Sequence, residues 1–298
     1  MMRTAAIFNP SAAKGRSLRK LDQVKNCLDR EGIEHDLVFT QNAGHAEILA
    51  EKLVRDGYEC IISIGGDGTL NEIVNGIIKA NGNPVLGIIP VGTCNDFVKS
   101  FNIPSRIDKA CAIIRHGNVA SCDIAQVGNR YFINAIGIGF DVAVVEELQN
   151  SRVLRGFMSY LMTAVKNAFR YKGLELFIRN GQNHFSRKTL MIAIANGRYY
   201  GGGFKIAPHA NASDGFLDVI IINNMSSIKR LFAIPRFLNG SHIHLPETEV
   251  FKTVDLTIKS DQRLTCQVEG ELFKWTEPEI DIKLLPQRIR IFTNDAVH

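Results

Sequence analysis

The first part of the chain alternates between short apolar runs that suit strands and longer segments that suit helices. Between the runs, apolar residues recur at a spacing of three or four, as at Leu18, Leu21, Val24 and Leu28. This alternation predicts right-handed βαβ units and a doubly wound, mostly parallel sheet in an α/β domain. The expected strands of this domain are Thr4–Phe8, Asp36–Phe39, Cys60–Ile64 and Val85–Ile89.

After about Cys122 the pattern changes to strand-like runs, several of which alternate between apolar and polar residues. This pattern predicts an antiparallel β-sandwich with one buried face, interrupted by two helices at about 156–171 and 226–239. We therefore expect an α/β domain at residues 1–122 and a β-sandwich domain at 123–298, with a return of the last residues to the first domain left open. The expected strands are Tyr131–Ile136, Leu174–Ile178, Thr189–Ala195, Leu217–Ile222, Val254–Ile258, Leu264–Val268, Ile280–Leu284 and Ile289–Phe292.

Composition and charge narrow the functional classes. The 298 residues are 45% hydrophobic and 22% charged, which is ordinary for a globular protein and argues against disorder. The net charge of +5 suits an anionic partner, but no basic block interleaved with aromatics indicates nucleic acid. The six cysteines are scattered and the apolar runs are shorter than the ~20 residues of a membrane span, so we expect a cytoplasmic protein.

The segment Cys60–Ile78 has the pattern of a phosphate-binding turn. An apolar strand runs into Gly65, Gly66 and Gly68, and a helix is expected from about Leu70. Thr69 and Glu72 have the spacing of a capping box. Backbone amides at a helix N-terminus after such a turn bind phosphate, and glycines let phosphate oxygens approach the backbone. A plain Gly-Asp-Gly turn is the structural alternative.

An acidic residue in this turn indicates a metal–nucleotide complex, and a second turn has a similar arrangement. Asp67 would repel a phosphate unless Mg²⁺ lay between them. The second turn, Pro90–Phe97, also follows an apolar strand and contains Asp96, for which a helix N-cap is the alternative role. In a parallel sheet both turns lie at the carboxyl edge, where ligands bind and where two other expected strands end at Asn9–Ser11 and Thr40.

The motifs GGDGTLNE and GTCNDF, with a leading FNP, resemble the diacylglycerol kinase catalytic-domain family. The similarity is to the soluble bacterial lipid kinase branch, related to sphingosine and ceramide kinases and more remotely to NAD kinase. It continues through CDIAQV, NAIGIGFD, ANGRYYGGGFKIAPHANASDGFLDV and QVEGE, and so extends over nearly the whole chain. The glycine turn alone would also admit NAD kinase.

The resemblance implies an ATP-dependent lipid kinase with its active site in a cleft between the two domains. Asp67 and Asp96 would organise Mg²⁺, the triphosphate and the acceptor hydroxyl, and Glu271 would act as general base. The chain has Glu269 where the family has an aspartate. A structural Mg²⁺ site maps to the Asp214 carboxylate and the carbonyls of Asn211 and Phe216. The implied ATP contacts are Asn9, Ser11, Thr40, Gly65, Gly66, Asp67, Gly68, Thr69, Leu70, Asn71, Glu72 and Thr93.

Three further expectations concern partners and competing interpretations. We expect a lipid alcohol, by default diacylglycerol, peripheral association with an anionic membrane surface, and no nucleic acid; a homodimer is left open. A soluble-substrate kinase of the NAD kinase type and a non-catalytic nucleotide or lipid sensor are the alternative functions.

Without the resemblance, Glu269 and Glu271 would be assigned to one solvated strand face. The helical stripe Phe157, Tyr160, Leu161 and Ala164 indicates core packing, and His209, His242 and His244 are expected at the surface.

Overall fold

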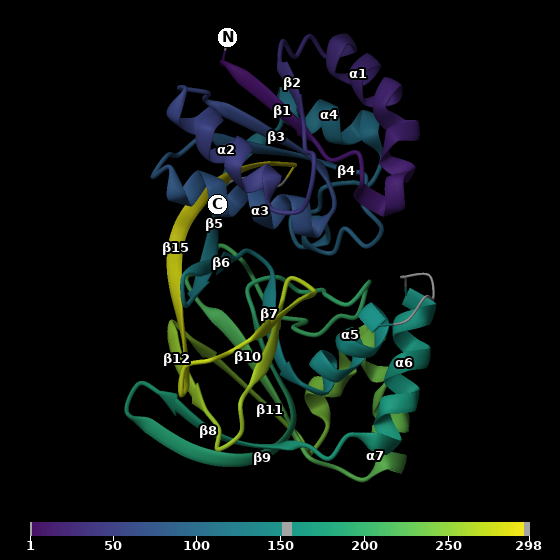
Figure 1. Ribbon diagram of the computed structural model, residues 1–298, viewed down its shortest axis with the longest axis vertical. Helices are drawn as coiled ribbons and strands as arrows, with labels where there is room; N and C mark the ends of the chain where they lie inside the picture. The colour runs from purple at the N-terminus through teal and green to yellow at the C-terminus, as the bar shows by residue number, and fades with distance from the viewer. Residues whose placement is uncertain (1, 151–156, 295–298) are drawn as a thin grey trace. The chain divides into compact units, whose positions relative to one another are not determined.

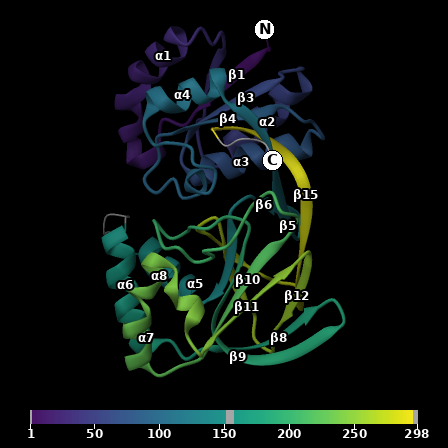
Figure 2. The same ribbon diagram turned by 180° about the vertical axis from the view of Figure 1, so that it is seen from behind.

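The computed structural model describes residues 2–150 and 157–294, which divide into two compact units. The first unit contains the chain up to Ile124 and again from Pro286, and the second contains Ala125–Leu285. Figures 1 and 2 show the course of the chain through both units from opposite sides. Each unit is described separately below.

The first unit is built on a parallel sheet. Strands β1 (Thr4–Phe8), β2 (Asp36–Phe39), β3 (Cys60–Gly65) and β4 (Val85–Pro90) lie in the order β2-β1-β3-β4. The end of β15 (Glu279–Thr293) adds a parallel strand beside β4. β1, β3 and β4 are buried along their whole length. Buried strands of a parallel sheet are apolar runs rather than alternating ones, which explains why the pattern predicted them closely.

Helices lie on both faces of this sheet, so the predicted doubly wound arrangement is confirmed. Helices α1 (Leu21–Arg30) and α4 (Ile107–His116) pack with one face of β1, β3 and β4. Helices α2 (His45–Arg55) and α3 (Asp67–Lys79) pack together on the opposite side of the sheet (Figure 1). Short 3-10 helices, η1 (Ala12–Lys20) and η2 (Phe97–Lys99), follow β1 and β4.

The second unit is antiparallel, as predicted, and its strand order is β14-β13-β7-β9-β8-β12-β15, with β10 between β9 and β11. On β9, Ile192 and Ile194 enter one apolar core, while Met191 and Ala193 enter another on the opposite face. The strands of this unit are β6 (Arg130–Phe132), β7 (Ala135–Gly139), β8 (Leu174–Asn180), β9 (Asn183–Ala195), β10 (Leu217–Asn223), β11 (Thr248–Thr253), β12 (Asp255–Lys259), β13 (Thr265–Val268) and β14 (Glu271–Lys274), and β5 (Asn118–Val127) enters it from the first unit.

A group of helices covers the second of these faces. They are α5 (Phe140–Asn150), α6 (Phe157–Arg170), α7 (Ser227–Ala233) and α8 (Arg236–Asn239), followed by η3 (Ser241–His244) (Figure 2). Their inward side chains, among them Tyr160 and Leu161, pack against β9 and β10. In the described chain no helix is long and apolar enough to cross a membrane.

Several boundaries differ from the sequence-based expectations for local reasons. The helix expected at 226–239 is two helices, because Pro235 follows the end of α7 and has no N–H to continue it. The runs Ile280–Leu284 and Ile289–Phe292 belong to one strand, β15. Tyr131–Ile136 is divided between β6 and β7, and α5 was not expected at all.

Candidate functional site

The glycine turn of the first unit joins β3 directly to α3. β3 ends at Gly65 and α3 begins at Asp67, with Gly66 at the N-cap position. Because the helix begins three residues before Leu70, the predicted Thr69–Glu72 capping box is wrong. Thr69 Oγ1 instead accepts a hydrogen bond from Asn9 Nδ2 at 2.8 Å, which ties the end of β1 to the first turn of α3.

Glu72 serves a different helix from the one that contains it. Its two carboxylate oxygens accept hydrogen bonds from the backbone N–H groups of Gly44 and Ala46, at 2.9 and 3.1 Å. Gly44 is the N-cap of α2 and has no side chain to do this. An acceptor with negative charge is favoured at a helix N-terminus, so Glu72 stabilises the start of α2.

The two small-residue turns touch through their backbones. The N–H groups of Val91 and Gly92 both donate to Gly65 O at 2.9 Å. A Cβ on Gly92 would overlap the Cα of Gly66, so glycine is required for this approach. A Cβ on Gly68, in contrast, would have no atom within 4 Å. The first turn of α3 therefore has open space beside it, where a ligand can approach the helix N-terminus.

The acidic residues Asp67 and Asp96 lie together at this turn. Asp67 Oδ1 accepts a hydrogen bond from Phe97 N at 3.0 Å, and Asp96 Oδ1 is paired with Lys99 Nζ at 2.5 Å. Burial, followed by the neighbouring charge of Asp96, raises the pKa of Asp67. Burial also raises the pKa of the adjacent Cys94 thiol to about 11, which keeps it protonated and unreactive at neutral pH.

This donor set fits Mg²⁺ held together with a nucleotide. No group of three or more His, Cys, Asp or Glu side chains suited to a metal occurs among the described residues. Mg²⁺ does not need such a cage, because it commonly binds one or two carboxylates and completes its shell with water and substrate phosphates. Asp67 and Asp96 would be the two carboxylates.

The other predicted nucleotide contacts differ in their hydrogen bonds and in their exposure. Asn9 Oδ1 accepts from Ser11 N at 2.9 Å, so these two residues order the turn after β1. Thr40 N donates to Phe8 O at the end of β1. Thr93 is exposed, whereas the side chain of Leu70 is buried in the core and leaves only its backbone for a ligand.

In the second unit, Glu269 and Glu271 lie at the hairpin between β13 and β14. Glu269 and Gly270 form its two-residue turn, both with positive φ (54° and 81°), as a type I′ hairpin turn requires. Glu269 Oε1 accepts from the N–H groups of Ile133 and Asn134, at 3.0 and 2.6 Å. Glu271 begins β14 and is exposed. The two residues therefore do not share one strand face, and Glu269 orders the loop before β7.

The Asp214 turn is already neutralised by a cation of the protein. Asp214 Oδ2 is paired with Lys252 Nζ, and its Oδ1 accepts from Phe216 N at 3.1 Å. Asn211 O accepts from Asp214 N at 3.2 Å. Lys252 also lies 3.8 Å from the buried Asp218, which is its cross-strand partner. A structural Mg²⁺ at this turn would have to displace the Lys252 ammonium or bind beside it, as Mg²⁺ at Asp96 would with Lys99, and the Asp214 site stays a prediction.

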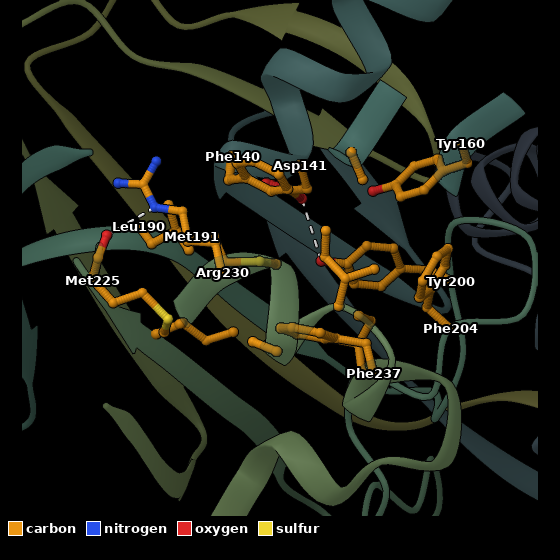
Figure 3. A pocket seen from close by; sticks show the side chains of 15 residues that line it. Phe140, Asp141, Tyr160, Leu190, Met191, Tyr200, Phe204, Met225, Arg230 and Phe237 are labelled. Carbon is orange, nitrogen blue, oxygen red and sulfur yellow. Dashed lines mark hydrogen bonds between the residues drawn. The ribbon is translucent and has the colours of Figure 1, made fainter. Parts of the chain in front are cut away.

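A small apolar cavity lies in the second unit between the sheet and helices α5–α8 (Figure 3). Its volume is about 50 Å³, and its walls are almost entirely apolar. Apolar cavities of this kind stay dry and accept apolar ligands. The residues lining it include Phe140, Tyr160, Ala164, Met191, Phe204, Met225, Ile234 and Phe237.

One carboxylate, that of Asp141, lies in the wall of this cavity (Figure 3). Its Oδ2 accepts from Tyr200 Oη and Gln267 Nε2, each at 3.3 Å, while Oδ1 is buried without a hydrogen-bond partner in the described structure. Burial raises the pKa of Asp141 to about 6. A Cβ on Gly137 would overlap this carboxylate, which explains the first glycine of the GIGFD segment. Sequence reasoning noticed that segment but assigned Asp141 no role.

Comparison with known proteins agrees with this architecture. The family model for the diacylglycerol kinase catalytic domain matches residues 3–127, and that for the YegS C-terminal NAD kinase beta sandwich-like domain matches residues 134–293. A protein named diacylglycerol kinase from Staphylococcus aureus (strain MRSA252) is 30% identical over 272 residues, which are 90% of this chain and 86% of the relative. Its counterpart from strain bovine RF122 / ET3-1 has the same identity and coverage.

Crystal structures show the same fold. A diacylglycerol kinase from Bacillus anthracis str. Sterne is 22% identical and aligns over 100% of this chain and 98% of that chain, with a TM-score of 0.76. Another structure from the same organism aligns with a TM-score of 0.83 at 24% identity. The glycine turns, the α/β unit and the sandwich define a kinase of two-unit architecture. The chain belongs to the diacylglycerol kinase family.

Proposed function

We propose that this kinase transfers the γ-phosphoryl group of ATP to the hydroxyl of a membrane lipid, with diacylglycerol as substrate and phosphatidic acid as product. The observation that supports this most directly is the pair of turns at the carboxyl edge of the first sheet, where Gly92 contacts Gly66 and Asp67 lies near Asp96. Family membership supports the lipid substrate, because the relatives are named diacylglycerol kinases.

The first unit would hold the nucleotide. Phosphoryl transfer depends mainly on positioning and on charge neutralisation. The N-terminal turn of α3 offers backbone amides and the positive end of the helix dipole to the triphosphate. Mg²⁺, held through Asp67 and Asp96, would neutralise phosphate charge. Asn9, Ser11, Thr40 and Thr93 belong to the turns that would surround the nucleotide.

The second unit would hold the lipid and supply the base. Glu271 is exposed at the start of β14, where a carboxylate can accept a proton from an alcohol. The apolar cavity would take hydrocarbon of the substrate, since its walls are almost entirely apolar and its polar groups are those of Asp141, Arg230 and two tyrosines. Arg230 is occupied by backbone carbonyls, to which it donates at 2.6 to 3.1 Å.

The test is a phosphorylation assay with labelled ATP and a panel of lipids in mixed micelles, with NAD included. Diacylglycerol should be phosphorylated and NAD should not. Glu271→Gln should lower kcat by about 10²–10⁴-fold, the usual contribution of general-base catalysis, with ATP affinity unchanged. Glu269→Gln is the matched control, because its amide oxygen can still accept from the 133–134 backbone.

Three other outcomes of these experiments would contradict parts of the proposed function. Phosphorylation of NAD alone would assign the protein to the soluble-substrate class. ATP binding without transfer to any acceptor would make it a sensor. If Gly68→Val, in a folded protein, left Mg-ATP affinity unchanged in calorimetry, the nucleotide would not lie beside α3, because a branched side chain there fills the open space.

We further propose that the protein works in the cytoplasm and reaches its substrate by peripheral association with anionic membranes. The net charge of +5 supports this, since a basic residue near an anionic surface contributes about 1 kcal/mol. Binding to vesicles should then rise with the anionic lipid fraction and fall with salt. Vesicle binding that changes with neither the anionic lipid fraction nor the salt concentration would contradict the electrostatic part of the proposal.

A further inference from the structure

Helix α6 is apolar on its outward side as well as on its inward side. Tyr160, Leu161 and Ala164 pack inward, as predicted, and the side chain of Phe157 lies outside the described residues. On the opposite side, four exposed apolar residues follow one another at intervals of four, three and four, which is the spacing of a single helix face. They are Met158, Met162, Val165 and Phe169.

The neighbouring helices also carry exposed apolar residues. Ile228 and Phe232 are one turn apart on α7, which packs against α6, and Leu238 is exposed on α8. The exposed fractions are 69% for Met162 and 76% for Phe232. Figures 1 and 2 both show α6 and α7 side by side in the helical layer of the second unit. We call Met158, Met162, Val165, Phe169, Ile228, Phe232 and Leu238 the apolar face. Single exposed apolar residues are common, but a gathering on adjacent helices marks an interaction surface.

The two segments that contain the apolar face contribute charges of one sign. The sequence has no Asp or Glu from Phe157 to Gly173 or from Val219 to Pro246. The same two segments contribute exposed Lys166, Arg170, Lys172, Lys229 and Arg236. Lys166 and Lys229 are paired with Glu147 and Glu247, which come from outside these segments. The apolar face therefore has a border in which basic residues outnumber acidic ones, a composition typical of helices that lie in the interface of an anionic bilayer.

We propose that the apolar face inserts into the interfacial layer of an anionic membrane, with the basic residues contacting lipid headgroups. A second copy of the chain is a poorer occupant. A two-fold dimer would place the same basic border against itself, and like charges repel. This inference rests on the proposed lipid kinase function, and it specifies which surface meets the membrane.

The apolar cavity supports this choice of occupant. Tyr160 and Ala164 of α6, Ala233 of α7 and Phe237 of α8 line it from the inner sides of the same helices whose outer sides form the apolar face. Insertion of these helices would bring the cavity next to the hydrocarbon layer, so that a lipid could enter it without crossing water.

The main test is vesicle sedimentation with the double variant M162D/F232D. The probes are vesicles of phosphatidylglycerol and phosphatidylcholine at several ratios, and vesicles of phosphatidylcholine alone. Binding of the double variant to the anionic vesicles should fall by about tenfold or more, which corresponds to about 1.4 kcal/mol. The matched control is Ile48→Asp, which changes an exposed apolar residue of α2 in the first unit and should leave binding unchanged. Equal binding of wild type and double variant would overturn the proposal.

A second variant covers the case in which two aspartates impair folding. Phe232→Trp adds a reporter to a chain whose one tryptophan, Trp275, lies away from the apolar face. Its emission should shift to the blue on anionic vesicles and be quenched by brominated acyl chains, relative to wild type. Unchanged emission on vesicles that bind the protein would overturn the assignment of this surface. So would sedimentation analysis showing a dimer that M162D/F232D dissociates and that does not bind vesicles.

Activity separates this proposal from the proposed function. With a short-chain diacylglycerol dispersed in water, M162D/F232D should retain wild-type kcat, because no bilayer has to be reached. If wild type bound vesicles through the apolar face but phosphorylated no lipid, the docking surface would stand and the lipid kinase function would fail.

Discussion

Replacing Asp141 with asparagine removes the one carboxylate in the cavity wall while keeping its shape. The amide oxygen of the new side chain could still accept from Tyr200 and Gln267. The pKa of Asp141 is raised from 3.8 to about 6 by burial. A buried acid with a raised pKa keeps a proton that the unfolded chain releases. Its contribution to folding stability is therefore largest at low pH and is lost as the pH rises from 3.8 to about 6.

The size of this loss follows from the two pKa values. Their difference corresponds to about 3 kcal/mol at about 1.36 kcal/mol for each unit of pKa. Because other carboxylates titrate in the same range, the useful quantity is the difference in unfolding free energy between Asp141→Asn and wild type. Relative to wild type, the unfolding free energy of Asp141→Asn should rise by about 3 kcal/mol as the pH is raised from below 3.8 to above 6.

The measurement is urea unfolding at a series of pH values, followed by the fluorescence of Trp275. This residue lies in the second unit, where its Nε1 donates to Glu279 O at 2.8 Å, and so it reports on the unit that contains Asp141. Asp261→Asn, at an exposed position of the same unit, is the control and should show no such change. Parallel pH profiles for wild type and Asp141→Asn would refute the argument that burial governs this carboxylate.

Three further substitutions test individual contacts. Gly137→Ala should cost about 1–3 kcal/mol in urea unfolding, because the new methyl overlaps the Asp141 carboxylate, and the added change Asp141→Ala should recover much of the loss. Glu72→Gln should weaken the start of α2 by about 1 kcal/mol and speed hydrogen exchange at Ala46; unchanged exchange would contradict the capping role. Lys252→Met should lower the melting temperature, and added Mg²⁺ should recover part of it in the variant only; equal Mg²⁺ stabilisation of wild type would show that the turn binds metal beside Lys252.

The sequence was most informative where burial was continuous. Strands β1, β3 and β4 of the first unit were predicted within a residue or two, because a run buried on both faces is apolar throughout and stops at glycine, proline or asparagine. The second unit was predicted as antiparallel from the alternation of apolar and polar positions, as along Val254–Ile258. Helix α5 was missed because its apolar residues do not gather on one clear helical face.

The site was harder to predict, because its contacts join residues far apart in the chain. Thr69 and Glu72 have the local spacing of a capping box, but the Glu72 carboxylate caps a helix whose N-cap lies 28 residues earlier. Asp141 accepts a hydrogen bond from Gln267, which lies 126 residues away in the chain. His242 was expected at the surface and is buried instead, stacked on Phe237 and bonded to Ile206 O, and burial lowers its pKa to about 4.

The course of β15 has a consequence for how the chain is made. The edge of β4 in the first unit is completed by Arg290 and Ile291, which are synthesised long after their partners Val85 and Leu86. Until then, β4 presents unpaired backbone groups to any other strand, a recognised route to aggregation. The first unit should therefore reach its final state only after the end of β15 has been translated. A fragment ending at Ile124 would lack its last strand however well its own residues fold.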